Sequence, residues 1–177
     1  IVLLMIFQAG NNLIQQGFEE AGAYEGMSFE LSKLGKAPKL EHEVSLIENK
    51  GDLKAFIPII ERCFDFTKVA AELYIDIFEK HFDNPNIRHY KIEKEGKVVA
   101  MGSLFYDKQV CGFYNLGVLP EYRNQGLATA MQTFRLQEAK AMGAKTAVLQ
   151  ASSMANKLDK EVGFEPKLMF TAYQKKP

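Results

Sequence analysis

The stretch Val118-Leu-Pro-Glu-Tyr-Arg-Asn-Gln-Gly-Leu-Ala-Thr129 decides the fold of this chain. A predicted strand, Val110–Val118, ends at its start, and a long apolar-faced helix that stops before Gly143 opens within it. N–H groups at a helix start have no intrahelical acceptor, and the macrodipole places roughly half a positive charge there. Gly126 lets an anion approach the backbone, and Arg123 adds a permanent cation. The stretch therefore predicts a phosphate-binding turn, with a plain tight turn as the alternative.

Two familiar phosphate-binding motifs are absent from the sequence. No Gly-Lys-Ser or Gly-Lys-Thr occurs, which excludes the P-loop pattern, and no Gly-x-Gly-x-x-Gly follows a predicted strand. P-loop nucleotide hydrolysis and Rossmann dinucleotide chemistry are therefore disfavoured.

On both sides of this stretch, within residues 41–177, segments with the apolar spacing of strands are interspersed with segments that have the apolar spacing of helices. A charged turn, Lys94-Glu-Gly-Lys97, joins two strands of an antiparallel meander. The strands are predicted at 42–48, 87–93, 98–106, 110–118, 146–151 and 164–173, and the helices from 52, after 67, from the turn at 121–129 and at 153–162.

Apolar spacing predicts which faces of the helices are buried. The first helix is expected to bury Leu53, Phe56, Ile57, Ile60 and Cys63, the second Val69, Leu73, Ile77 and Phe78, and the third Leu127, Met131, Phe134, Leu136 and Ala139.

The beginning of the chain has a different composition. Residues 1–32 hold four acidic residues and no Lys or Arg, whereas Lys33–Lys39 carries three lysines with Gly and Pro. This change predicts a linker at 33–40. The strand, helix and strand expected at 1–8, 11–17 and 24–31 are too few for an independent core.

Composition excludes several classes of protein. With 177 residues, 47% hydrophobic and 25% charged, the chain is predicted to be one globular domain with a small appendage. Lysines and arginines balance acidic residues at 22 each, so no nucleic-acid or membrane partner is expected. The first apolar run has seven residues, against roughly 20 for a bilayer span. Cys63 and Cys111 lack zinc-site spacing, as do His42 and His81, so no metal is expected and reduced thiols predict a cytoplasmic location.

The residues around the turn resemble a known family. The pattern Val118-x-Pro120-x-x-Arg123-x-x-Gly126-x-Ala128 is similar to the signature of the GNAT superfamily of acyl-CoA-dependent N-acyltransferases, and Leu158-Asp-Lys-Glu-Val-Gly-Phe164 resembles a later element of it. The resemblance covers 41–177 and implies an α/β (α+β) fold, with a mixed, mostly antiparallel central sheet flanked by helices and splayed between the strands that end near Val118 and Ala151. Residues 17–29 resemble the tail of a partial N-terminal GNAT-like lobe, which implies domains at 1–32 and 41–177 joined by the linker, with more of that lobe missing from the printed chain.

The resemblance implies where acetyl-CoA binds. Leu116, Gly117 and Val118 would pair with the pantetheine arm, and the Val118 N–H would polarise the thioester carbonyl. Ser152 stands where many members have an Asn that contacts the coenzyme. The residues expected at the pyrophosphate are Arg123, Asn124, Gln125, Gly126, Leu127, Ala128 and Thr129.

Acid and base residues are less clear from the resemblance. Asp159 replaces the Tyr that often reprotonates the coenzyme A thiolate, and with an ordinary pKa near ~3.9 it is a weak acid candidate. Solvent is the preferred acid, and Tyr173 is a second weak candidate. Phe64-Asp-Phe66 either anchors the core or borders the acceptor site. Glu121, His89, Tyr114 and Asp107 are chemically suited to act as the base, and none is singled out.

The predicted function is transfer of an acetyl group from acetyl-CoA to a primary amine of an unidentified small-molecule or peptide acceptor by direct attack. The alternatives are a non-catalytic acyl-CoA-binding or interaction module and a purely structural domain. The protein is expected to be a monomer or a homodimer.

Overall fold

The computed structural model describes residues 3–6, 10–36 and 40–175. The chain forms two compact units: a terminal unit, Ile1–Phe29 with Val148–Pro177, and a central unit, Glu30–Ala147. These units follow a different partition from the predicted domains at 1–32 and 41–177, which stay a prediction.

The terminal unit is built on a three-stranded arrangement. Strand β8 lies between β1 and β2 and is antiparallel to both. The elements of this unit are β1 (Leu3–Ile6), α1 (Gly10–Gln15), β2 (Phe18–Glu30), α5 (Asn156–Val162) and β8 (Glu165–Lys175), and β7 (Thr146–Ala151) crosses the boundary between the units.

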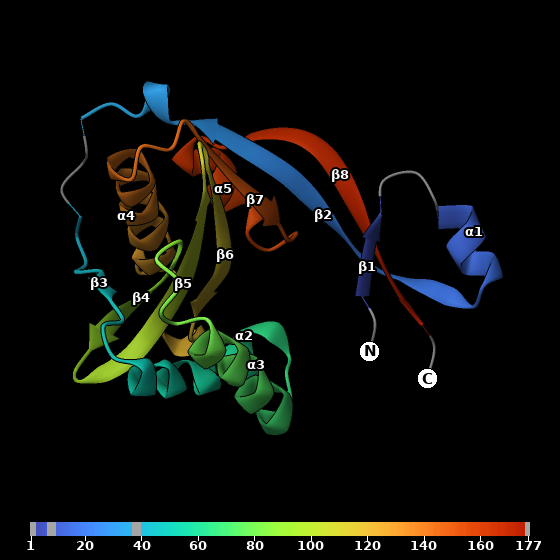
Figure 1. Ribbon diagram of the computed structural model, residues 1–177, viewed down its shortest axis with the longest axis horizontal. Helices are drawn as coiled ribbons and strands as arrows, with labels where there is room; N and C mark the ends of the chain where they lie inside the picture. The colour runs from blue at the N-terminus through green and yellow to red at the C-terminus, as the bar shows by residue number, and fades with distance from the viewer. Residues whose placement is uncertain (1–2, 7–9, 37–39, 176–177) are drawn as a thin grey trace. The chain divides into compact units, whose positions relative to one another are not determined.

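The central unit contains an antiparallel sheet in the order β3-β4-β5-β6 (Figure 1). Its strands are β3 (Ser45–Leu46), β4 (Ile87–Lys94), β5 (Lys97–Asp107) and β6 (Val110–Val118). Its helices are η1 (Leu31–Lys33), η2 (Lys50–Phe56), α2 (Ile57–Phe64), α3 (Lys68–Lys80), η3 (Pro120–Tyr122) and α4 (Leu127–Ala141).

Helices cover both faces of this sheet. Successive strand residues point to opposite faces, so neighbours on β4 report what packs on each side. His89 stacks on Phe78 of α3, with ring centroids 4.3 Å apart, whereas Tyr90 meets Phe134 of α4 at 5.2 Å. Helix α4 therefore lies on one face, and η2, α2 and α3 lie on the other around a buried apolar cluster.

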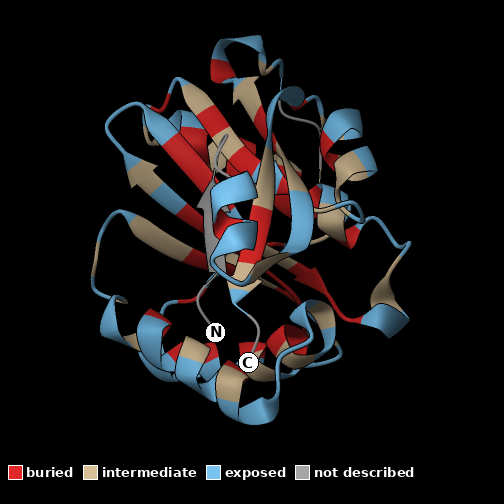
Figure 2. Cartoon of the chain, turned by 90° about the vertical axis from the view of Figure 1, so that its right-hand side faces the viewer, coloured by how far each residue is buried: buried red, intermediate tan, exposed pale blue. Residues whose placement is uncertain are grey.

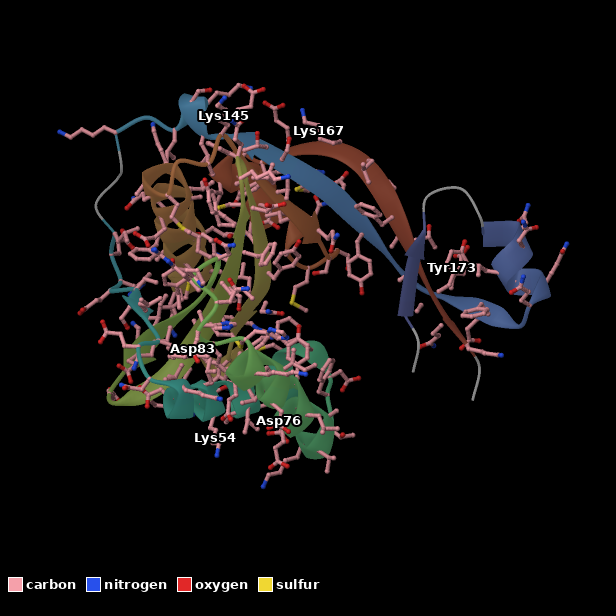
Figure 3. All side chains as sticks on the ribbon, in the orientation of Figure 1. Lys54, Asp76, Asp83, Lys145, Lys167 and Tyr173 are labelled. Carbon is pink, nitrogen blue, oxygen red and sulfur yellow. The ribbon has the colours of Figure 1, made fainter. Side chains whose placement is uncertain are left out.

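The buried face of α3 differs from the predicted one. Of the four residues expected in the core only Phe78 is buried, whereas Val69, Leu73 and Ile77 are 66%, 60% and 55% exposed. The prediction was wrong because α3 carries a second apolar stripe, Ala71-Ile75-Phe78, which packs inward. Figure 2 shows the exposed outer surface of the helices, and Figure 3 shows Asp76 on the outer side of α3.

Several element boundaries also differ. The strand expected at 42–48 is only Ser45–Leu46, and the helix expected from 52 is a 3₁₀ helix followed by α2. Pro58 explains this break, because a proline has no N–H to donate one turn back and therefore favours the first turn of an α-helix. The third helix begins only at Leu127.

The predicted fold class is confirmed as a mixed, mostly antiparallel α/β arrangement with flanking helices. The splay expected between the strands that end near Val118 and Ala151 involves both units and stays a prediction. Of the strand expected at 1–8, residues 1–2 and 7–8 lie outside the described part, and the strand expected at 24–31 is longer, starting at Phe18.

Candidate functional site

The predicted phosphate-binding turn is an exposed loop that leads from η3 into α4. Asn124 and Gly126 adopt left-handed backbone conformations, with φ of 58° and 77°. The Gly126 carbonyl accepts the first helical hydrogen bond, from Ala130 N at 2.9 Å. Among the described residues, the N–H groups of Asn124, Gln125 and Gly126 have no acceptor. The loop therefore presents unpaired donors at the positive end of a 15-residue helix.

There is room at this loop for an anion to reach the backbone. A Cβ at position 126 would have no neighbour closer than 3.7 Å, and the atoms at that distance are Glu41 Oε2 and His42 Nε2. His42 Nε2–H also donates to the Gln125 carbonyl at 2.7 Å. Nothing in the sequence spacing pointed to these two residues, because they lie more than 80 positions before the loop.

Strand β6 contains a bulge just before the predicted pantetheine-pairing residues. Ser103 pairs with Tyr114, but Met101 pairs with Gly117, so the single residue Gly102 on β5 faces two residues on β6. The first of these two, Asn115, has a left-handed φ of 58°. An extra residue of this kind shifts the hydrogen-bonding pattern of every residue that follows.

The bulge determines the direction of the Val118 N–H. Leu119 N donates to Val99 O at 3.0 Å, so the backbone N–H of Leu119 points toward β5. Because hydrogen-bonding directions alternate along an antiparallel strand, Leu116 and Val118 point their N–H and C=O groups away from β5. Had the Ser103–Tyr114 register continued, Val118 would face Val99 and its N–H would be used in the ladder.

The Arg123 side chain turns back toward the end of β6. Its Nε donates to the Val118 carbonyl at 3.1 Å, and its Nη2 lies 3.8 Å from Cys63 Sγ. The Cys63 thiol donates to the same carbonyl at 3.2 Å. Arg123 was expected to place its cation at a phosphate, whereas here the guanidinium fixes the end of the strand.

Glu121 is held in an ion pair. Its carboxylate accepts two hydrogen bonds from Arg62, at 2.9 and 2.8 Å, and lies 3.6 Å from Lys97 Nζ. The hydrogen bonds from Arg62 lower the pKa of Glu121 to about 2. A carboxylate with so low a pKa is a poor proton acceptor at neutral pH, so Glu121 fastens η3 to α2 and does not suit the role of general base.

The other base candidates are scattered. His89 is buried, and desolvation lowers its pKa to about 4. Tyr114 is exposed on β6, and Asp107 is exposed at the end of β5 beside the turn into β6. Of these three, only Tyr114 lies next to the bulge.

Ser152, Asp159 and Tyr173 belong to the terminal unit. The Ser152 hydroxyl accepts from Ala155 N at 3.4 Å. Asp159 is buried, with 2% of its surface exposed. Tyr173 is buried, its hydroxyl lies 3.5 Å from Glu20 Oε1, and desolvation raises its pKa. By contrast, Leu116–Val118 and Arg123–Thr129 come together within the central unit.

The described residues contain no group of three His, Cys, Asp or Glu side chains able to hold a metal ion. In the same part of the chain, no helix combines the length and apolar character that a bilayer crossing requires. A hollow lined by Gly51, Asp52, Lys91 and Gly96, among others, involves none of the predicted site residues.

The model of the Acetyltransferase (GNAT) family matches residues 53–164, more than half of the chain. The chain therefore belongs to the GNAT acetyltransferase family. No curated protein sequence matches it.

Solved structures share the fold at low sequence identity. A GCN5-related N-acetyltransferase from Kribbella flavida is 17% identical with a TM-score of 0.71, and the match covers 95% of this chain and 63% of that one. A GCN5-related N-acetyltransferase from Sphaerobacter thermophilus is 18% identical with a TM-score of 0.72, covering 97% and 58%. The chain thus spans less than two thirds of these two proteins. A predicted acetyltransferase with acetyl-CoA from Clostridium acetobutylicum is 16% identical with a TM-score of 0.61, covering 71% and 92%.

Proposed function

We propose that this protein transfers an acetyl group from acetyl-CoA to a primary amine of a small-molecule or peptide acceptor. The observation that carries the proposal is the Val118 N–H at the end of β6, which points away from β5 and is followed within one loop by the unpaired N–H groups of Asn124–Gly126. Family membership and a structural relative described with acetyl-CoA support the same cosubstrate.

The loop suits the diphosphate of coenzyme A. Its free donors and the helix dipole favour a negative charge, and Gly126 leaves the backbone open. Residues Asn124 to Thr129 would hold the diphosphate, and the backbone groups of Leu116–Val118 that point away from β5 would pair with the pantetheine arm. Acetyl-CoA supplies the activated acyl group.

In the proposed reaction the acceptor nitrogen attacks the acetyl carbonyl carbon. A C–N bond forms and the C–S bond breaks, so the products are an amide and coenzyme A. The Val118 N–H donates to the carbonyl oxygen while it gains negative charge. In this proposal the amine loses one proton to water and the thiolate takes one from water. The pKa values of Glu121 and His89 suit neither residue to the base role.

Calorimetry with acetyl-CoA tests the diphosphate site. The change Gly126→Val should weaken binding at least about 100-fold, because a branched side chain fills the approach and disfavours a left-handed backbone. Gly96→Val is the matched control, since Gly96 has a similar φ of 74°, also has open space, and lies in the β4–β5 turn. Unchanged binding by the Gly126 variant would contradict the proposed site.

A binding-only module is the second candidate, because two of the four base candidates have pKa values unsuited to the role. Coenzyme A release can be followed with a thiol reagent across a panel of amines, amino acids and peptides. Turnover with any of these acceptors would reject the binding-only function, and stoichiometric binding without turnover across the panel would favour it.

A further inference from the structure

The bulge in β6 is held from both faces of the sheet by buried and partly buried side chains. It includes Asn115, whose left-handed conformation is uncommon for a residue with a side chain, and asparagine tolerates it better than most. A conformation of this kind persists when its surroundings impose it.

Arg135 of α4 braces the face that α4 covers. Its Nη1 donates to the carbonyls of Ser103, at 2.8 Å, and Tyr114, at 2.9 Å. These two residues are the last register pair before the bulge. Gly102 makes the approach of Arg135 feasible, because a Cβ there would lie 3.3 Å from Arg135 Cζ and 2.9 Å from Met131 Cγ. Arg135 itself is only 1% exposed.

A chain of hydrogen bonds braces the opposite face. The Tyr74 hydroxyl donates to Asn115 Oδ1 at 3.0 Å, and Asn115 Nδ2 donates to Ser103 Oγ at 3.2 Å. Ser103 Oγ lies 2.9 Å from His89 Nδ1. Burial lowers the pKa of His89 to about 4, so at neutral pH its ring is uncharged and one hydrogen lies between Nδ1 and Ser103 Oγ. The Asn115 amide is therefore tied at both its oxygen and its nitrogen.

We propose that Asn115 and Arg135 are positioning residues for acyl transfer, acting through Val118. By holding the bulge, they keep the residues after it in the shifted register, in which the Val118 N–H points away from β5. This inference rests on the proposed function, because it takes that N–H to be the donor to the acetyl carbonyl oxygen. Neither residue needs to touch acetyl-CoA.

The test uses three variants that remove, to different degrees, the hydrogen bonds by which Arg135, Asn115 and Tyr74 hold the bulge. Asn115→Gly keeps easy access to a left-handed backbone and removes both amide ties. Arg135→Lys keeps the charge and loses the forked donor. Tyr74→Phe removes one hydroxyl and keeps the ring that packs on Phe66 and Phe78. Ile92→Val, at a buried position of β4, is the control for a small loss of packing in the same sheet that leaves the hydrogen bonds to the bulge intact.

Two measurements separate positioning from general destabilisation. Calorimetry compares coenzyme A with S-acetonyl-coenzyme A, a stable analogue that keeps the carbonyl but cannot transfer it. Asn115→Gly and Arg135→Lys should leave coenzyme A affinity unchanged and reduce the preference for the acetonyl analogue. With an accepted amine, kcat should fall about 10- to 100-fold with little change in KM for acetyl-CoA. Tyr74→Phe should show a smaller shift in the same direction, and Ile92→Val none.

Retention of both the wild-type analogue preference and kcat in Asn115→Gly and Arg135→Lys would overturn the positioning role while leaving the proposed function intact. If these two variants do not fold, Tyr74→Phe decides in the same way. Failure of the wild-type protein to bind either coenzyme derivative would instead overturn the proposed function, and the positioning role with it.

Discussion

Helices α3 and α4 both pack on the central sheet, yet they use their side chains in opposite ways. Helix α4 buries two polar residues, Gln132 and Arg135, among its apolar ones. Helix α3 leaves Leu73, and two further apolar residues one turn before and after it, in solvent. The difference shows that residue polarity alone does not identify the buried face of a helix when the strand opposite it offers hydrogen-bond acceptors.

The bulge in β6 explains why α4 buries a polar side chain, Arg135, against the sheet. Two backbone carbonyls next to the bulge, those of Ser103 and Tyr114, accept hydrogen bonds from the α4 side. Arg135 satisfies both, which a leucine at the same position could not do. On the α3 side, Tyr74 has to face Asn115, and its neighbours Ala71, Ile75 and Phe78 turn inward with it.

The largest effect is expected from truncating a residue on the inner face of α3, compared with truncating one on its outer face. Ile75→Ala should lower the free energy of unfolding by about 2–5 kcal/mol, because it removes a fully buried side chain and leaves a cavity. Ile77→Ala is the matched control, and at 55% exposure it should change stability by no more than about 0.5 kcal/mol. Urea denaturation measures both, and equal losses would contradict the assignment of the inner stripe.

A second effect should come from His89, on the α3 side of the sheet. Burial lowers its pKa from 6.5 to about 4, so the unfolded chain binds a proton before the folded one does. The stability from the neutral ring is therefore complete above pH 6.5 and is lost as the pH falls toward 4, by about 3 kcal/mol.

The comparison for His89 is the pH dependence of His89→Asn, which keeps a side-chain amide able to hydrogen-bond Ser103 and does not titrate. The free energy of unfolding of the wild-type protein should fall more steeply between pH 6.5 and 4 than that of the variant. Parallel pH profiles would show that the α3 side of the sheet is more hydrated than the structure indicates.

The smallest effect is expected from the exposed ion pair between Arg62 and Glu121, which lies just before the loop that leads into α4. Arg62 lowers the pKa of Glu121 from 4.5 to about 2, so the stability from this pair is present above pH 4.5 and lost as the pH falls through 2. Wild-type protein should exceed Glu121→Gln in stability at pH 7, and the two should converge near pH 2. Because the pair is exposed, added salt should also shrink the difference. A difference that persists at pH 2 would contradict this origin.

The features predicted correctly from the sequence depend on residues that are close together in the chain. The loop at Arg123–Thr129 and the strand at Val110–Val118 were both expected, since a glycine-containing turn between a strand and a helix is a local signal. The register of β6 was not predicted, because a bulge depends on the partner strand. The hydrogen bonds that hold the bulge were not predicted for the same reason. Tyr74, Ser103 and Arg135 are separated by tens of residues and come close to the bulge only in the folded chain.

The sequence by itself determined the class of fold, the family pattern and the start of α4, because these depend on the periodicity and turn preferences of neighbouring residues. Tertiary structure decided which stripe of α3 is buried, where the Arg123 guanidinium points and which way the Val118 N–H faces. Each of these outcomes depends on satisfying backbone carbonyls and filling space against a distant segment, and such partners are not specified by the spacing of nearby residues.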